Sequence, residues 1–255
     1  VEVTAGGKMI RELNNSFPIP GKSIALTIDA KLQRLVENSF GNRKGGLVAI
    51  EPSTGEILAF VSMPNFDPNA FIDGIDQKIW KELNTSPDKP LLNRPLKGLY
   101  PPGSTYKPFM ALAALSSGAK DPTEFINDPG YFVLGNHKFR DSSQGGHGQV
   151  DMKKSIIVSS DTYYYKLAIG MGVDLIHEYI SPFGFGKQTG VDLTGEARGI
   201  LPSSSWKLQR HGKQWLQGET PSIGIGQGYN TFTILQMAKA TSIIANRGVM
   251  IKPRL

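Results

Sequence analysis

The residues of this sequence best suited to do chemistry are serines that precede a lysine by three positions. A serine at the start of a helix and a lysine one turn later lie on the same face. A buried, neutral lysine in that position can take the serine hydroxyl proton and leave a nucleophile. The pattern S-x-x-K occurs at Ser86/Lys89, Ser104/Lys107, Ser117/Lys120 and Ser204/Lys207. The pattern indicates a serine nucleophile without selecting one.

The local sequence argues against three of these pairs. Pro87 directly follows Ser86 and places that pair in a loop. Gly118 follows Ser117 and marks the end of a helix rather than its start. Ser204 lies within a run of three serines, where an N-cap is the simpler interpretation.

Ser104 has a different setting. It follows the stiff turn 101–103 and begins a helix that is apolar on all sides over 109–115, a pattern typical of a buried helix. A buried lysine without a partner is costly, so a polar pair at this point needs a reason. Two interpretations stay open here: a nucleophile with its base, or an N-cap serine whose lysine reaches solvent. Pro108 predicts that the first turn of the helix is irregular.

Other catalytic and cofactor motifs are absent from the sequence. It contains no cysteine, which excludes disulfides, thiol nucleophiles and thiolate zinc sites. His177-Glu178 is followed by Ser181 where a zincin needs its second histidine. The run Gly224-x-Gly226-x-Gly228 ends in Tyr229 where a dinucleotide fingerprint needs glycine.

The chain is mildly basic, with a formal charge of +6 and an isoelectric point near 9.4. Such a charge suits an anionic cell-wall polymer, nucleic acid or solubility alone. No cluster of Lys and Arg is longer than the pair Lys153-Lys154, which argues against nucleic acid. No run of about 18 apolar residues occurs, so these residues predict no membrane span.

The elements that must position the serines follow strand-like and then helical patterns. The sequence predicts a linker over 1–22, a strand over 23–28, a helix capped by Asp29, and a hairpin of strands 46–50 and 57–61 joined by the turn 52–55. Both hairpin strands are continuously apolar, so we expect both faces to be covered. Helices are expected over 104–117, 162–170, 174–180 and 231–246. An early hairpin followed by helices, without a βαβ rhythm, indicates an α+β fold.

Several segments in order carry a family resemblance. Tyr100-Pro-Pro-Gly-Ser-Thr-Tyr-Lys-Pro-Phe109 resembles the nucleophile segment of penicillin-binding transpeptidases. Ser159-Ser160-Asp161 resembles their second motif, S-x-N, with Asp in place of Asn, and the following Thr162-Tyr163-Tyr164-Tyr165 is similar to the penicillin-binding protein 2 branch that serves cell elongation. Further matches lie at 28–33, 51–57, 64–69 and 224–229. Each motif is modest alone; their order is specific, and they cover the chain from about residue 20 onward.

The resemblance implies a fold, an activity and roles for four residues. The fold would be that of penicillin-binding transpeptidases and serine β-lactamases, an antiparallel sheet flanked by helices plus a helical subdomain. The activity would be a peptidoglycan D,D-transpeptidase that works through an acyl-serine without a cofactor and is acylated by β-lactams. Ser104 would be the nucleophile and Lys107 its general base. Ser159 would relay a proton, and Asp161 would hold the substrate or the lysine.

The sequence departs from the family pattern at the third motif, K-[ST]-G, which is nowhere in the chain. Lys187-Gln188-Thr189-Gly190 has an inserted residue and a different place in the order. We therefore expect residues 1–22 to be a linker or the end of an upstream pedestal domain, and 23–255 to be a transpeptidase domain truncated at its C-terminus. Its sheet would be incomplete and the activity of this piece doubtful.

A second departure concerns metal. Some elongation-type relatives hold zinc with Asp, Asp, His and Cys, and Asp128, Asp141 and His147 resemble the first three of these ligands. Ser160 stands where the cysteine would be, and a hydroxyl is a poor zinc ligand. The sequence therefore favours an ordered loop with hydrogen-bonded carboxylates, and no metal is predicted.

Partners and location follow from the resemblance as well. It implies peptidoglycan stem peptides, β-lactams, and the glycan polymerase and shape proteins of the elongation machinery as partners, and no nucleic acid. It implies a periplasmic domain of a bacterial protein anchored in the inner membrane. A serine β-lactamase and a β-lactam sensor or scaffold that is acylated without turnover are the alternatives.

Overall fold

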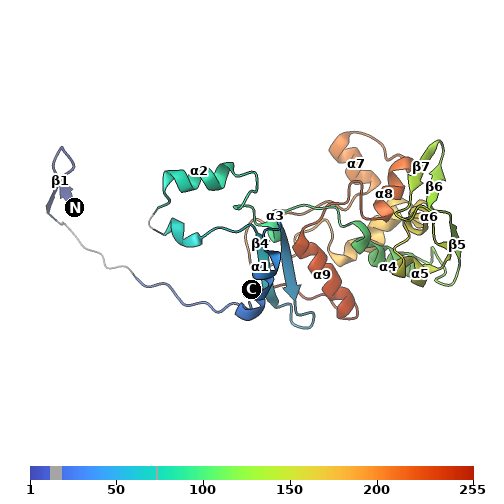
Figure 1. The fold of residues 1–255 in the computed structure, drawn as a ribbon, viewed down its shortest axis with the longest axis horizontal. Coiled ribbons are helices and arrows are strands. Elements are labelled where there is room, and N and C mark those ends of the chain that lie inside the picture. Colours follow the sequence, from blue (N-terminus) through green and yellow to red (C-terminus); the bar gives the residue numbers. More distant parts are fainter. Residues whose placement is uncertain (12–18, 73) are drawn as a thin grey trace.

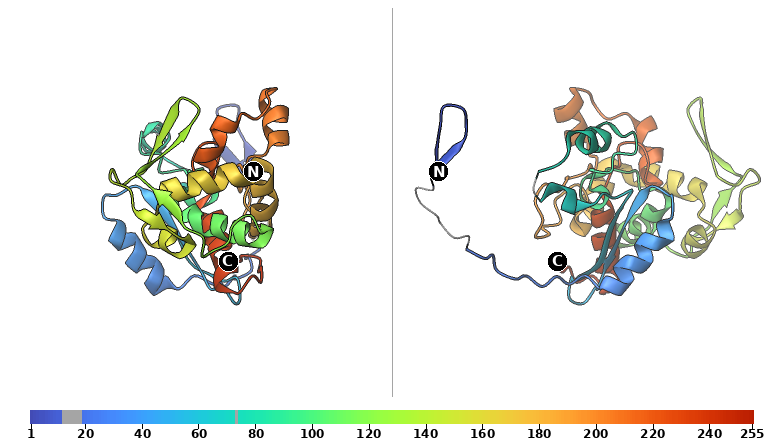
Figure 2. Two further views of the ribbon diagram at one scale, coloured as in Figure 1. Left: turned by 90° about the vertical axis from the view of Figure 1, so that its right-hand side faces the viewer. Right: turned by 60° about the vertical axis from the view of Figure 1, so that its left-hand side comes forward.

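An antiparallel hairpin of β3 (Gly45–Ile50) and β4 (Ile57–Met63) forms the sheet part of the computed structural model, which describes residues 1–11, 19–72 and 74–255. The predicted hairpin and its turn are confirmed. Helix α1 (Ala30–Phe40) packs along the hairpin, and α3 (Arg94–Lys97) and α9 (Ile234–Ala245) also contact it (Figures 1 and 2). Leu47 faces a solvent-open hollow beside α1, whereas a Cβ on Gly46 would meet Ile234 Cδ1 of α9 at 2.8 Å. Helices thus lie on both faces of the hairpin, although all of β3 is only half-buried.

The start of α1 follows the predicted cap. Asp29 accepts hydrogen bonds from the backbone N–H groups of Lys31 (2.8 Å) and Leu32 (3.0 Å), and these bonds hold the pKa of its carboxyl below the ordinary value. The Asp29 N–H donates to Leu58 O at 2.9 Å, which ties the helix start to β4.

The strand predicted over 23–28 is wrong. Ile24 and Leu26 are 84% and 57% exposed, and no strand forms there within the described residues. The backbone partners at the start of β4 are taken instead by the end of the chain, since Ile57 N–H donates to Arg254 O at 2.9 Å. Only the Thr27 hydroxyl reaches that point, with a bond of 2.8 Å to Ile57 O. Alternation predicted a strand here, but in the described part of the chain this segment pairs with no strand.

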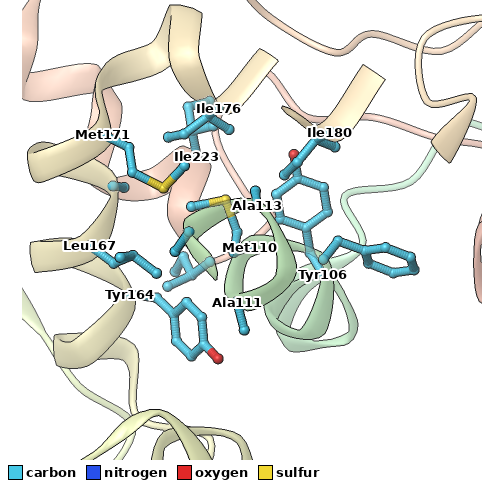
Figure 3. Packing of buried hydrophobic residues seen from close by; sticks show 14 of the residues in the cluster. Tyr106, Met110, Ala111, Ala113, Tyr164, Leu167, Met171, Ile176, Ile180 and Ile223 are labelled. Carbon is cyan, nitrogen blue, oxygen red and sulfur yellow. The ribbon is translucent and has the colours of Figure 1, made fainter. Parts of the chain in front are cut away.

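The helical part contains α4 (Lys107–Ser117) and most of the helices that follow it in the chain (Figure 1). It contains α5 (Met152–Ile157), α6 (Asp161–Ile180), α7 (Ser204–His211) and α8 (Thr220–Gly224), with the antiparallel pairs β5 (Ile126–Asp128)–β8 (Gly148–Val150) and β6 (Tyr131–Leu134)–β7 (His137–Arg140). Figure 3 shows Met110 and Ala113 of α4 within the cluster formed with Met171, Ile176 and Ile223. The helix is buried on most of its surface, although Leu112 (36%) and Leu115 (43%) are exposed.

The predicted helices 162–170 and 174–180 correspond to the two halves of α6, which kinks at Gly172 (φ 74°, ψ 158°). Helix α9 occupies most of the predicted 231–246. The prediction of an α+β arrangement, with an antiparallel hairpin and a helical part, is confirmed.

The remaining elements lie outside these two parts or connect them. A hairpin of β1 (Glu2–Val3) and β2 (Met9–Arg11) lies within the predicted linker 1–22, of which 12–18 are outside the described residues. Further short elements are helix α2 (Gln77–Thr85) and the 3-10 turns Pro68–Phe71, Ser181–Phe183 and Gln217–Glu219. In the described part of the chain, no helix combines the length and the apolar character needed to cross a membrane.

A buried ion pair joins α7 to the turn before α8. Lys207 is 3% exposed and its ammonium donates to the Glu219 carboxylate, which also accepts from Leu216 N–H (2.9 Å) and Tyr229 OH (3.1 Å). Burial opposes ionisation of Glu219, but the bonds from Lys207, Leu216 and Tyr229 outweigh it and hold its pKa below the ordinary value. Lys207 belongs to one of the four S-x-x-K pairs, and this contact gives it a structural role.

Glu219→Gln is expected to lower the free energy of unfolding by about 2 kcal/mol at pH 7, because the Lys207 ammonium stays buried without a countercharge. Since the folded-state pKa of Glu219 is depressed, its contribution is present above the unfolded-state pKa of about 4.3 and is lost as the pH falls through the folded-state value. Urea unfolding from pH 7 to pH 3 should show the wild-type and variant curves converging in acid.

Glu56→Gln is the matched control, because the Glu56–Arg254 pair is largely exposed and is worth about 0–1 kcal/mol. A Glu219→Gln protein as stable at pH 7 as the Glu56→Gln protein would contradict the structural role of the Lys207–Glu219 pair.

Candidate active site

The nucleophile candidate lies on a tight turn at the head of α4. Residues Gly103–Tyr106 form a 3-10 turn, and the α-helix itself begins at Lys107. This confirms the irregular first turn expected from Pro108, which has no N–H to donate. Ser104 is exposed on this turn, and its carbonyl accepts the Lys107 backbone N–H. The serine hydroxyl is therefore accessible, whereas the lysine three residues later is buried.

The Lys107 ammonium is 2% exposed and is held by the second predicted motif. Its Nζ donates to Ser159 O at 2.6 Å, Ser159 Oγ at 3.0 Å and Asp161 Oδ1 at 2.7 Å. These three acceptors match the three donors of an ammonium group. The structure thus brings Lys107, Ser159 and Asp161 together, although more than fifty residues separate the lysine from the other two in sequence. Among the described residues, the hydrogen bonds of Lys107 Nζ do not include Ser104 Oγ.

The side chains of residues 159–161 point in two directions: two toward Lys107 and one into the protein. Ser159 and Asp161 face Lys107, while Ser160 is fully buried and caps α6 by accepting the Tyr163 N–H at 3.1 Å. Ser159 adopts a left-handed backbone (φ +55°), which a serine rarely takes. In this conformation both its carbonyl oxygen and its hydroxyl reach the same ammonium.

The ring of Tyr164 lies beside the lysine ammonium. Lys107 Nζ lies 5.6 Å from the centre of the Tyr164 ring, within reach of a cation–π contact. Burial raises the pKa of Tyr164 to about 12, with an opposing bond to Ser155, so the phenol is neutral at physiological pH. Tyr106, on the turn itself, is fully buried, and burial raises its phenol pKa as well. The site therefore contains one cation, one facing carboxylate and neutral walls.

The other S-x-x-K pairs do not converge on such a site. Ser86 caps the end of α2 and Lys120 pairs with Glu124. Ser204 donates its hydroxyl to Asp174 Oδ2 at 2.7 Å, while Ser203, rather than the suggested Ser204, is the N-cap of α7.

The three residues that resemble zinc ligands, Asp128, Asp141 and His147, lie close together in the structure. One ligand atom each from Asp128, Asp141 and His147 lie within 4.8 Å of one another, and His147 Nε2 is buried without a hydrogen-bond partner among the described residues. Ser160 Oγ donates its proton to Asp128 Oδ2 at 2.7 Å. A thiolate-containing zinc set needs a cysteine, and this chain has a serine hydroxyl at that position.

The carboxylates of this cluster are satisfied by hydrogen bonds. Burial opposes ionisation of Asp141, but the N–H groups of Thr162 (2.7 Å) and Ser143 (3.2 Å) bond to it and hold its pKa below the ordinary value. Asp128 accepts from Gly130 N–H at 2.8 Å in addition to Ser160. An ordered loop with hydrogen-bonded carboxylates, as the sequence favoured, describes these contacts.

Sequence reasoning missed how the glycine run 224–228 serves the nucleophile. Gly226 lies against the 3-10 turn that carries Ser104, and Gly103 N–H donates to Gly226 O at 3.0 Å. A Cβ on Gly226 would meet Gly103 O at 2.4 Å, and one on Gly224 would meet Tyr164 O at 2.5 Å. Gly224 and Gly226 thus permit close backbone packing, a role unrelated to the dinucleotide fingerprint that the run does not match. The three glycines at alternate positions 224, 226 and 228 were the feature of the sequence that could have indicated this close packing.

The fold and this arrangement define a class: an α+β protein with a serine–lysine pair at the head of a buried helix. A family model described as "Penicillin binding protein transpeptidase domain" matches residues 45–255. The chain is 46% identical over 257 residues to "Peptidoglycan D,D-transpeptidase MrdA" of Acinetobacter baumannii, a match that covers 100% of this chain and 38% of the relative. The chain thus spans about two fifths of the curated relatives it matches.

Solved structures agree with the sequence comparison. The crystal structure of Pseudomonas aeruginosa PBP2 in complex with WCK 5153 superimposes with a TM-score of 0.89 at 49% identity, covering 93% of this chain and 55% of that one. Helicobacter pylori PBP2 in its complex with MreC gives a TM-score of 0.89 at 34% identity, covering 99% of this chain and 47% of that one. The chain belongs to the penicillin-binding protein transpeptidase family and has its fold. The relatives named above are of the MrdA, or PBP2, type.

Proposed function

We propose that this chain is the catalytic part of a peptidoglycan D,D-transpeptidase that cross-links stem peptides during cell elongation and is a target of β-lactams. The observation that supports this most directly is the contact of the buried Lys107 ammonium with Ser159 and Asp161, one turn after an exposed Ser104. A fold shared with transpeptidases at 46% sequence identity supports the same reaction.

Lys107 is the general base of the proposed reaction. Once Nζ loses one proton, two N–H groups remain, which match Ser159 O and Asp161 Oδ1 as acceptors. The lone pair is then free to take the hydroxyl proton of Ser104. Asp161 thus orients the amine, and its second oxygen is available to a substrate.

The acylation step follows from these positions. Ser104 Oγ bonds to the carbonyl carbon of the penultimate D-alanine while its proton moves to Lys107 Nζ, and the amide bond to the terminal D-alanine breaks. The leaving amine takes a proton from Lys107 through Ser159 Oγ, which lies 3.0 Å from Nζ. An amine of a second stem peptide then attacks the ester carbonyl and forms the cross-link. The amine gives up one proton, which passes through Lys107 Nζ to Ser104 Oγ as the ester bond breaks. The N-terminal end of α4 and the Ser104 N–H would stabilise the oxyanion.

The partners and location of the whole protein belong to the same proposal. The Helicobacter pylori relative was solved with MreC, which supports a shape protein of the elongation machinery as a partner. A glycan polymerase, inner-membrane anchoring and a periplasmic position of this domain are proposed on the same family grounds. Residues 1–22 would link the domain to a pedestal, and 23–255 would form most of the transpeptidase domain.

Intact-protein mass spectrometry after exposure to penicillin tests the proposal on the protein at the length of its curated relatives. We expect one stable adduct, which peptide mapping should place on Ser104 and which Ser104→Ala should abolish. Ser204→Ala is the matched control, because Ser204 opens another S-x-x-K pair but bonds to Asp174. Rapid loss of the adduct would instead indicate a β-lactamase. A stable adduct without cross-linking of stem peptides would indicate a sensor, and absence of any adduct would exclude all three functions.

A further inference from the structure

Ser159 contacts Lys107 while its own backbone is in a conformation that serine rarely adopts. Its left-handed backbone (φ +55°) accompanies the bonds of both its oxygens to Lys107 Nζ, at 2.6 Å and 3.0 Å. Backbone of this kind persists where the surrounding structure over-determines it. The contacts of the residues that follow Ser159 therefore bear on the position of the lysine.

Two buried carboxylates supply those contacts. Asp128 Oδ2 accepts the Ser160 hydroxyl at 2.7 Å, and Asp141 Oδ2 accepts the Thr162 N–H at 2.7 Å. Asp128 is 1% exposed and Asp141 is 8% exposed, so neither bond competes freely with water. Together they fix the residue after Ser159 and the second residue of α6. We call these four residues, Asp128, Asp141, Ser160 and Thr162, the carboxylate clamp.

The clamp is anchored on its other side by backbone. The second oxygen of each carboxylate also accepts an N–H group: Gly130 donates to Asp128 Oδ1 at 2.8 Å, and Ser143 donates to Asp141 Oδ1 at 3.2 Å. The two carboxylates are further joined because Asp141 N–H donates to Gly130 O at 2.9 Å. Both oxygens of both carboxylates thus act as acceptors, and the loop 126–150 is tied to the second motif.

We propose that Asp128 and Asp141 are positioning residues for acylation: through the carboxylate clamp they keep Ser159 in its left-handed conformation and thereby orient the Lys107 amine. This rests on the proposed function, in which Lys107 is the base. The clamp does not touch Ser104 or the reacting carbonyl, so we expect it to change the rate of acylation more than the affinity for substrate, which it reaches only through Asp161.

Asp128→Asn and Asp141→Asn test the clamp without changing side-chain size. An amide has one acceptor oxygen, so each variant must lose one of two accepted bonds. We expect the first-order acylation rate with a fluorescent penicillin to fall about tenfold to a hundredfold, with the non-covalent dissociation constant within about twofold of wild type. Active-site titration should correct both numbers for any unfolded fraction.

Asp174→Asn is the matched control. Asp174 also accepts through both oxygens at a helix N-terminus, from the N–H (2.8 Å) and hydroxyl (2.7 Å) of Ser204, but it has no contact with the second motif. It should leave the acylation rate at the wild-type value. An equal loss in Asp174→Asn and the clamp variants would overturn the proposal in favour of a general loss of structure.

A double-mutant cycle separates positioning from stability. Ser160→Ala removes the donor to Asp128, and the Asp128→Asn/Ser160→Ala double variant should acylate no more slowly than the slower single variant. Fully multiplicative losses would overturn the proposal. Zinc content and the effect of a chelator on the wild-type rate complete the measurement. A slower wild-type rate after chelation would overturn the direct hydrogen-bonded clamp in favour of a metal.

Hydrogen exchange gives a readout that does not depend on acylation. Peptides covering 155–165 should exchange faster in Asp128→Asn and Asp141→Asn than in wild type and Asp174→Asn. If hydrogen exchange of these peptides is the same in the two variants as in wild type, the carboxylate clamp does not hold the second motif, and the proposal is overturned even if penicillin binds. If wild type forms no adduct while the exchange pattern holds, the proposed function fails and the structural part of the clamp stands.

Discussion

Lys107→Met is expected to slow acylation by penicillin by a factor of about 10²–10⁴, because Ser104 loses its general base. Methionine preserves the length and apolar stem of the side chain, so the packing around Tyr164 changes little. The variant still leaves Asp161 without its cation, and some loss of stability should accompany the loss of rate. The acylation rate of the folded fraction, followed with a fluorescent penicillin, is the measurement.

Lys207→Met is the control that makes this result interpretable. It also removes a buried lysine from an S-x-x-K pair and leaves a carboxylate, Glu219, unpaired. Its stability should fall, yet its folded fraction should acylate at the wild-type rate. Wild-type acylation by Lys107→Met would refute the base assignment. Similar rates in the two variants would mean that the loss of any buried lysine slows the reaction.

The sequence predicted correctly those elements that depend only on residues within or next to them. The hairpin of β3 and β4 needed two apolar runs and a Pro/Gly turn, the start of α1 needed only Asp29, and the irregular turn before α4 needed only Pro108. The strand over 23–28 failed because its outcome depends on a competitor more than two hundred residues away, where Arg254 takes the backbone position beside Ile57.

The candidate site divides in the same way. Spacing and the buried character of α4 singled out the pair Ser104/Lys107 but left a nucleophile and an N-cap open. The family resemblance decided for the nucleophile and added Ser159 and Asp161. The distances from Lys107 Nζ to Ser159 and Asp161 depend on the tertiary structure and cannot be predicted from a local sequence pattern. The left-handed backbone of Ser159 was also beyond prediction, since nothing in a serine's local sequence requires it.

A single methyl group on Gly226 is expected to disturb the site strongly. The added Cβ would lie 2.4 Å from Gly103 O and 2.7 Å from Tyr106 Cβ, so the clash is with backbone and cannot be relieved by a side-chain rotation. Gly226 also has a positive φ of +72°, which adds about 1 kcal/mol of strain for alanine. We expect Gly226→Ala to lose about 3 kcal/mol of stability in all, the upper part of the range for overpacking.

The loss of rate should exceed what instability explains. Because Gly103 directly precedes Ser104 and bonds to Gly226 O, relief of the clash must move the nucleophile turn, and a shift near 1 Å can cost about a hundredfold in rate. Gly118→Ala is the matched control: its φ of +70° gives the same backbone strain, but nothing lies within 4 Å of its Cβ. It should lose about 1 kcal/mol and acylate normally. If both variants acylate at one rate, the packing of Gly226 on the serine turn does not position Ser104.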